Sequence, residues 1–426
     1  MLIPIDRFRG SAGRLEAGLF VSYAELRAQE GVSGGGYRMM STGRLQITLE
    51  PAVLRWARER VRLELGALAD KIGVKAERVA EWEDSGKISF AQANRLAKTT
   101  HTPVGYLYLP TPPEDQLPIP DFRTVGDRPV GTPSPNLLET VQQMQRRQAW
   151  MREEMIEQGR EPLEFVGSID SGVDPVEVAA SMRASLGLEP DWARQQLSWT
   201  SALKLLRDQV EAAGILIVIN GVVGNNTHRP LDVEEFRGFA MIDEYAPLIF
   251  VNNSDFKAAQ MFTIVHELAH IWLGEPGVSN FDALEPASHE VELRCNQIAA
   301  EFLVPAEQMA AIWGELQDRP EPFQAVAHYF KVSTIVAARR GLDLGLIDRD
   351  EFFNFYRAWQ VDERRQAAAR RPGGSFWNNQ NVRIGHRFGA QVVRAAKEGR
   401  LLYQEAYALT GLRGKTFEKF SRSMGM

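Results

Sequence analysis

The sequence predicts an α+β protein that is mainly helical and contains one small sheet. Apolar residues recur at three- and four-residue spacing from Pro51 onward, which is the period of amphipathic helices. Three short apolar runs bounded by turn residues predict the strands, at 214–220, 239–242 and 247–252. From Phe256 onward helical patterns dominate again, and a small sheet followed by many helices is the α+β arrangement.

The composition excludes several classes of protein. The chain has 426 residues, of which 44% are hydrophobic and 24% charged, as in ordinary globular proteins with several domains. No apolar run approaches the roughly 18 residues of a membrane span, and the start lacks the apolar core of a signal peptide. The one cysteine, Cys295, forms no internal disulfide. We therefore expect a soluble cytoplasmic protein.

Charge is distributed unevenly along the chain. The net charge is −6, yet residues 364–426 carry 13 Lys+Arg against 3 Asp+Glu. An acidic body with a basic end predicts an anionic partner, and nucleic acid is the commonest one. The alternative is a solvent-exposed helical surface that happens to be rich in arginine.

The sequence His-Glu-Leu-Ala-His at 266–270 is the strongest chemical signal. On a helix, His266 and His270 lie one turn apart on one face, so both imidazoles can reach a single ion. Glu267, one step round the helix, is placed to take a proton from a metal-bound water. A chance match to this pattern in a chain with seven histidines is about a 1% event.

Catalytic zinc normally has three protein ligands, so a third is expected on the next helix. That helix contains Glu290, Glu292 and Glu301. We favour Glu292 because Asn296 lies one turn behind it and would orient a ligand. Glu290 and Glu301 are the other candidates for the third ligand. The alternative role for each of these carboxylates is to lie on a solvent-exposed helix surface. Cys295 is interpreted as a small buried hydrophobic residue rather than a ligand.

The residues from Phe262 to His270, followed by Glu292-x-x-x-Asn296-x-x-Ala-Ala-Glu-Phe-Leu-Val-Pro, resemble the ImmA/IrrE family of zinc metallo-endopeptidases over roughly 165–350. The resemblance implies that His266, His270 and Glu292 bind Zn²⁺, with Mn²⁺ as the alternative ion, and that Glu267 is the general base. Family members cleave a helix-turn-helix repressor, which implies a protein substrate. Arg294-Cys295 departs from the Glu-Ala that relatives often have there.

Residues 65–74 and 75–83 resemble an XRE-type helix-turn-helix, whose second helix meets base edges in the major groove. Arg78 is the candidate base contact. However, the stretch 75–85 has two basic and four acidic residues, which disfavours contact with phosphates, so docking to a protein is the alternative. A second pair near the end, 403–411 and 412–420, carries Arg413, Lys415 and Lys419, and its charge suits DNA better.

Changes in composition along the chain indicate the bounds of the remaining segments. Gly34-Gly35-Gly36 and the lack of apolar period mark a poorly ordered start, within which Met39 or Met40 is an alternative initiation site. Eight prolines between 110 and 135 exclude a helix there. The predicted segments are an N-terminal extension (1–46), an all-α XRE-like helix-turn-helix domain (47–109), a Pro-rich linker (110–136), a linking helix (137–164), a zincin-like metallopeptidase domain (165–315), a helical helix-turn-helix-like module (316–360) and a basic helical C-terminal region (361–426).

Two functions follow from these interpretations. The first is a zinc-dependent endopeptidase that cleaves a repressor or antitoxin-like protein and is coupled to a helix-turn-helix regulator. The alternative is a DNA-binding transcriptional regulator or antitoxin of a toxin–antitoxin or phage-like locus, with a non-catalytic peptidase fold. Glu267 favours the enzyme, because a purely structural zinc site does not need that base. Neither function involves a membrane.

Overall fold

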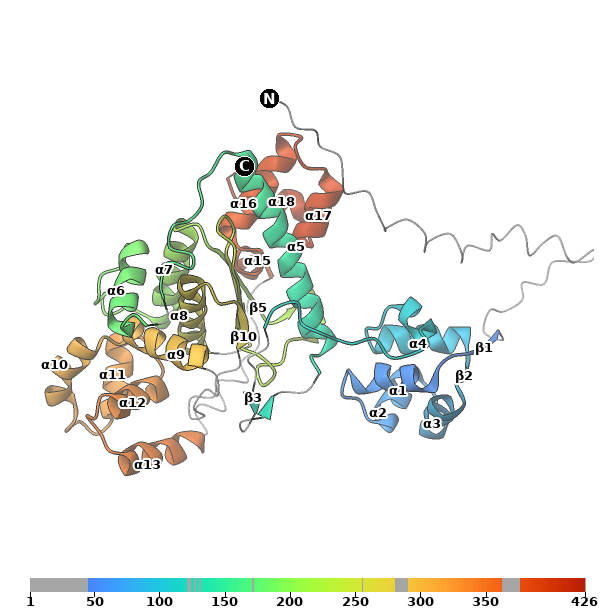
Figure 1. Cartoon of the computed structure of the whole chain (residues 1–426), viewed down its shortest axis with the longest axis horizontal. Coiled ribbons are helices and arrows are strands. Elements are labelled where there is room, and N and C mark those ends of the chain that lie inside the picture. Colours follow the sequence, from blue (N-terminus) through green and yellow to red (C-terminus); the bar gives the residue numbers. More distant parts are fainter. Residues whose placement is uncertain are drawn as a thin grey trace, which may run out of the picture.

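The computed structural model describes residues 45–120, 124–125, 128–129, 132–170, 172–254, 256–279, 290–361 and 376–425. The predicted N-terminal extension, with Met39 and Met40, lies outside these residues apart from its last two positions. The described residues are mainly helical with small sheets, which confirms the α+β class (Figure 1). Among them, no helix has both the length and the apolar character needed to span a bilayer.

The N-terminal helical unit, residues 46–108, has a core of its own built around Leu54, Leu68 and Trp82. Its second and third helices meet at Gly73, whose φ of +76° suits a residue without a Cβ. Helices therefore occur where the XRE-like pattern places them, while DNA binding by this unit stays a prediction. The elements are β1 (Gln46–Thr48), α1 (Pro51–Glu59), α2 (Leu65–Ile72), α3 (Ala76–Ser85), β2 (Lys87–Ser89), α4 (Phe90–Thr99) and the 3₁₀ helix η3 (Val104–Tyr108).

The central sheet has the strand order β10-β8-β9-β5. Its strands are β5 (Leu216–Asn220), β8 (Gly238–Met241), β9 (Leu248–Asn252) and β10 (Gly277–Ser279). β5 pairs with β9 in parallel, whereas β8 pairs antiparallel with both β9 and β10. The three predicted strands are confirmed, and every residue in them is buried because both faces of the sheet are covered. β10 was not predicted, since Gly-Val-Ser has too little apolar pattern.

One face of the sheet is covered by the helices that carry the His-Glu-Leu-Ala-His sequence and its surroundings. Side chains such as Ile217, Ile249 and Val251 point to this side and share a core with Val265, Leu268 and Ile298. The helices of this layer and the module that follows are α6 (Pro175–Ser185), α7 (Trp199–Ala212), α8 (Lys257–Leu273), α9 (Glu290–Leu303), α10 (Ala306–Leu316), α11 (Pro322–Phe330), α12 (Thr334–Asp343) and α13 (Arg349–Gln360).

The opposite face is covered by the long helix α5 (Pro135–Glu157) and by the C-terminal helices (Figure 1). Leu216, Val218 and Phe250 alternate with the residues of the first face and share a core with Phe388 and Phe417. The linking helix and much of the basic C-terminal region thus share a core with the sheet. These helices are α15 (Phe376–Ile384), α16 (His386–Lys397), α17 (Tyr403–Thr410) and α18 (Lys415–Ser423); the remaining short strands are β3 (Thr124–Val125), β4 (Arg128–Pro129), β6 (Val222–Val223) and β7 (Asn226–Pro230).

Arg147 of α5 joins these helices to one another. It is buried, and its guanidinium donates to the carbonyl oxygens of Leu409 at 3.0 Å and Arg383 at 3.1 Å. Both carbonyls belong to the last turn of a helix, where no backbone N–H of that helix is available. Arg147 therefore caps α17 and α15 at once, and its positive charge suits both C-terminal dipoles.

We predict that Arg147→Met destabilises the protein by about 3 kcal/mol, because it leaves two buried helix-end carbonyls without donors while keeping the side-chain volume. Urea unfolding followed by circular dichroism measures the change. Arg146→Met is the control, because the neighbouring Arg146 is exposed and should shift the midpoint little. Equal effects of the two substitutions would contradict the capping role.

Candidate metal centre

Helix α8 carries His266 and His270 in the interior of the protein. From Met261 to Trp272 almost every side chain is buried, and His266, Glu267 and His270 are all 0% exposed. Gly274, with φ of +73°, ends the helix one turn after His270. The two imidazoles lie on one face as their spacing predicts, with their Nε2 atoms 3.1 Å apart.

The other nitrogen of each ring is held by a fixed acceptor. His266 Nδ1 donates to Oδ1 of Asn296 at 3.0 Å, and His270 Nδ1 donates to the carbonyl oxygen of Glu275 at 2.8 Å. A proton on Nδ1 leaves the Nε2 lone pair available as a ligand. Asn296, which the sequence places behind the third ligand on α9, thus orients a histidine.

Glu292 lies directly opposite the two Nε2 atoms. Its carboxylate oxygens are 3.0 Å from His266 Nε2 and 3.1 Å from His270 Nε2, and the residue is 5% exposed. Burial alone would raise the pKa of Glu292, but the two imidazoles outweigh burial and hold this pKa well below its usual range. The carboxylate is therefore ionised, which is the form that binds a metal ion.

The two imidazoles differ in their electrostatic surroundings. Burial lowers the pKa of His266, with Glu292 opposing the change. Burial acts on His270 in the same direction, but Cys295 and Glu292 outweigh it and raise the pKa of His270.

The structure distinguishes Glu292 from the other two candidates for the third metal ligand. Glu290 is exposed at the first residue of α9. Glu301 is buried, but it contacts the guanidinium of Arg340 and accepts from the backbone N–H of Ala306. Glu301 therefore ties α9 to α10 and α12, and Glu292 is the acidic residue of α9 that faces both histidines.

Cys295 lies closer to the histidines than the sequence suggested. It is fully buried in the core of the first layer, as expected for a small hydrophobic residue. Its Sγ atom and the ligand nitrogens of His266 and His270 also lie within 4.8 Å of one another. Burial raises the pKa of the thiol, against the effect of His270. Cys295 is thus a second candidate donor beside Glu292.

Gly238 sets how closely the sheet approaches α8, and sequence reasoning gave it no role. A Cβ atom at this position would lie 2.8 Å from Glu267 Oε1 and 2.5 Å from Thr263 Cγ2. Both distances are below any ordinary contact, so only glycine leaves room for the carboxylate of Glu267. A glycine that opens an otherwise apolar strand is the signal that could have indicated this close approach.

The residues predicted to contact DNA lie away from this centre. Arg78 of α3 forms an ion pair with Glu81 one turn later, at 2.5 Å. Arg413 and Lys415 are exposed before and at the start of α18. Lys419 is also exposed, while Phe417 and Phe420 of the same helix are buried. The predicted contacts are therefore accessible, and DNA binding by them stays a prediction.

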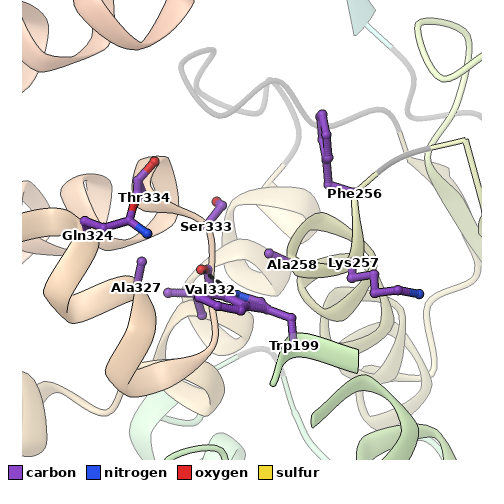
Figure 2. Close-up of a pocket in the computed structure, with 9 residues that line it drawn as sticks. All are labelled: Trp199, Phe256, Lys257, Ala258, Gln324, Ala327, Val332, Ser333 and Thr334. Atoms are coloured by element: carbon purple, nitrogen blue, oxygen red, sulfur yellow. Dashed lines mark hydrogen bonds between the residues drawn. The ribbon is translucent and has the colours of Figure 1, made fainter. Parts of the chain in front are cut away.

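A separate open pocket of about 280 Å³ lies at the N-terminal end of α8 (Figure 2). Trp199, Phe256 and Val332 form its apolar part, and Lys257, Ser333 and Thr334 are polar residues of its lining. Ala258, also in the lining, precedes His266 by eight residues, which is about 12 Å along the helix. The pocket contains none of the predicted metal ligands.

We predict that Gly238→Ala lowers the stability by roughly 1–3 kcal/mol, because the added methyl group overpacks the contact between β8 and α8. It should also disturb Glu267 more than the metal ligands. Thermal unfolding and metal content are the measurements. Gly66→Ala is the control, because a Cβ there meets no atom within 4 Å and alanine favours the helix α2. A Gly238→Ala protein as stable as the control would show that the contact can relax.

Two segments of the chain match known family models. Residues 210–341 match Peptidase_M78, described as an IrrE N-terminal-like domain. Residues 384–423 match a domain of unknown function, DUF8813, which covers helices α16 to α18. No curated protein matches the chain.

The first match begins in α7 and ends in α12, and it contains the four sheet strands, both histidines, Glu267 and Glu292. It supports the ImmA/IrrE resemblance over residues 210–341, the larger part of the 165–350 for which that resemblance was predicted. Residues 210–341 are thus similar to the IrrE N-terminal-like domain, and this similarity indicates a fold of metallopeptidase type.

Proposed function

We propose that the protein is a zinc-dependent endopeptidase that cleaves a regulatory protein, either a repressor or an antitoxin-like protein. The observation that carries this proposal is the buried triangle of His266, His270 and Glu292. Their facing atoms are 3.0–3.1 Å apart, while the far nitrogen of each ring is held by its own acceptor.

The donor set fits a catalytic zinc ion. Two histidines and one glutamate are ligands of catalytic zinc sites, which keep a fourth position open. Ligands about 2.0–2.1 Å from a tetrahedral ion lie about 3.3 Å from each other, close to the separations found between His266, His270 and Glu292. Mn²⁺ is the alternative ion, because nitrogen and oxygen donors also suit it. Cys295 is the other residue close enough to contribute.

Each residue of the centre has a separate role in the proposed hydrolysis. A zinc ion bound here would act as a Lewis acid toward the scissile carbonyl and would acidify a water molecule. Glu267 takes the proton of the attacking water and returns it to the leaving amine. Asn296 and the carbonyl of Glu275 keep the two imidazoles in one tautomer and one orientation. Burial of all these groups keeps other water away from them.

A contact between the N-terminal helical unit and the peptidase-type domain supports a regulatory role, and hence a regulatory protein as substrate. Arg62, just after α1, forms an ion pair with the buried Glu235 of the body at 3.7 Å. Glu235 in turn accepts from the backbone N–H and hydroxyl of Ser134, which caps α5. A helical unit held against the peptidase-type domain suits a protein that cleaves in response to a signal. The alternative, a DNA-binding regulator, remains the second candidate because Lys415 and Lys419 are exposed.

We predict that Glu292→Gln weakens metal binding at least tenfold, because it replaces an ionised ligand with a neutral amide. Inductively coupled plasma mass spectrometry after dialysis against a zinc buffer measures the bound metal. Glu290→Gln should retain about one ion per chain. Glu301→Gln should retain the ion but lower the unfolding temperature, because it loosens the contact with Arg340. If Glu290→Gln or Glu301→Gln lost the metal while Glu292→Gln retained it, the third ligand would be that other glutamate and not Glu292.

We predict that Glu267→Gln retains metal and fold but lowers peptide cleavage by about 10²–10⁴, because it removes the general base and leaves every ligand in place. Because the substrate is unidentified, the assay uses a synthetic peptide library read by mass spectrometry. Glu275→Gln is the matched control, since His270 contacts only the backbone carbonyl at that position. Equal cleavage by the wild type and Glu267→Gln would show that the activity does not depend on Glu267, and the absence of cleavage by the wild type would favour the regulator.

A further inference from the structure

Cys295 of α9 lies beside the two histidines of α8. Its side chain is 0% exposed, and its Sγ atom lies within 4.8 Å of the ligand nitrogens of His266 and His270. Within the part of the chain that the structure describes, these three residues form a group of donors that could hold one metal ion. The thiol is therefore a potential ligand as well as a side chain of the core.

Helix α9 turns three different polar groups toward α8 within little more than one turn. The carboxylate of Glu292 contacts Nε2 of both histidines, and the amide of Asn296 accepts from Nδ1 of His266. Cys295 follows Glu292 by three residues, a spacing that places two side chains on the same side of a helix. The helix that supplies the proposed third ligand thus also brings the thiol to the metal centre.

The separation of the thiol from the imidazoles is within reach of one tetrahedral ion. Zinc–sulfur bonds are about 2.3 Å long and zinc–nitrogen bonds about 2.0–2.1 Å, so sulfur and nitrogen ligands of the same ion lie about 3.6 Å apart. The upper limit of 4.8 Å for Cys295 exceeds this value by about 1.2 Å. Rotation about the Cα–Cβ bond of Cys295 covers that difference, so ligation does not require α9 to move.

A sulfur ligand would change both the preference of the site for a metal ion and its openness. Nitrogen and oxygen donors suit manganese as well as zinc, whereas a thiolate favours zinc. With Cys295, the two histidines and Glu292 make four protein ligands, the number of a closed tetrahedral zinc site. The thiolate would then take the position that a catalytic site leaves open. Glu267, fully buried in the same cluster, could activate no water until the thiolate left.

We propose that Cys295 is a fourth protein ligand of the metal ion, which makes the site select zinc and keeps it closed to water in the resting protein. Cleavage then requires the thiolate to leave. A substrate carbonyl entering as a fifth ligand can displace it, because zinc tolerates five ligands transiently. The closed resting state rests on the proposed peptidase function, whereas the sulfur ligand does not.

The absorption spectrum of the full chain loaded with Co²⁺ tests the sulfur ligand. A thiolate bound to Co²⁺ gives an intense charge-transfer band in the near ultraviolet, which nitrogen and oxygen ligands do not give. Cys295 is the one cysteine of the chain, so no other thiolate can produce this band. The wild type should show the band, and its absence from the Co²⁺-loaded wild type would overturn the proposal. This measurement needs no variant, so it does not depend on how a variant folds.

Competition between two metal ions gives a second measurement. After dialysis against equal concentrations of Zn²⁺ and Mn²⁺, Cys295→Ser should have a bound zinc-to-manganese ratio at least tenfold below that of the wild type. Ile298→Val is the matched control, because it removes one methyl group from the same buried side of α9 and no donor atom. An unchanged ratio in Cys295→Ser, or the same change in both variants, would overturn the proposal.

Cleavage of the synthetic peptide library at saturating zinc tests the closed resting state. Cys295→Ser should cleave at least tenfold faster than the wild type, because sulfur no longer holds the position that water needs. The double variant Cys295→Ser/Glu267→Gln should lose this gain. Equal rates in Cys295→Ser and the wild type would overturn the closed state. A charge-transfer band without cleavage by either chain would reject the proposed enzyme but support the sulfur ligand, so the two failures are distinguishable.

Discussion

The structure depends on enclosing two imidazoles and two carboxylates within a hydrophobic core. His266, Glu267 and His270 are fully buried, and Glu292 nearly so, which is costly unless each polar group has a partner. The surrounding elements supply partners for the two imidazoles, namely Asn296 from α9 and the carbonyl of Glu275 from the link to β10, while Gly238 in β8 leaves space for the carboxylate of Glu267. The positions of α9, β10 and β8 relative to α8 are therefore all constrained by the same cluster.

Buried arginines extend the same principle from the centre to the helix ends. Arg183 donates to the carbonyls of Glu301 and Phe302, and Arg340 donates to that of Val304, so the C-terminal end of α9 is capped by two side chains from outside it. Arg147 caps α15 and α17 in the same way on the other side of the sheet. Each arginine satisfies carbonyls that a helix cannot satisfy itself, and thereby fixes the position of α9 or of the C-terminal layer.

Local patterns in the sequence were sufficient wherever the structure depends on local spacing. The separation of His266 and His270 predicts a shared face, and the apolar runs at 214–220 and 247–252 predict strands, because helix and strand periods act over a few residues. Contacts between distant segments were not predictable in this way. The role of Glu301 depends on Arg340, 39 positions later, and the docking of Pro120 on β10 joins a linker to a three-residue strand. Gly238 is similar, because its importance comes from a helix that begins 19 residues later.

The basic C-terminal region shows why net charge by itself does not identify a nucleic-acid surface. Arg400 contacts Glu154 of α5, and Arg387 donates to the carbonyl of Glu211, so part of the positive charge holds this layer to the body. Phe388 and Phe417 of the same region fill the core against the sheet, so removing the region would expose that core rather than simply remove charge. Lys415 and Lys419 lie on the exposed side of α18, opposite the buried Phe417 and Phe420. Exchanging them for glutamine would change the field at the surface and leave the packing intact. Electrostatic attraction to DNA is therefore best separated from folding at these two residues.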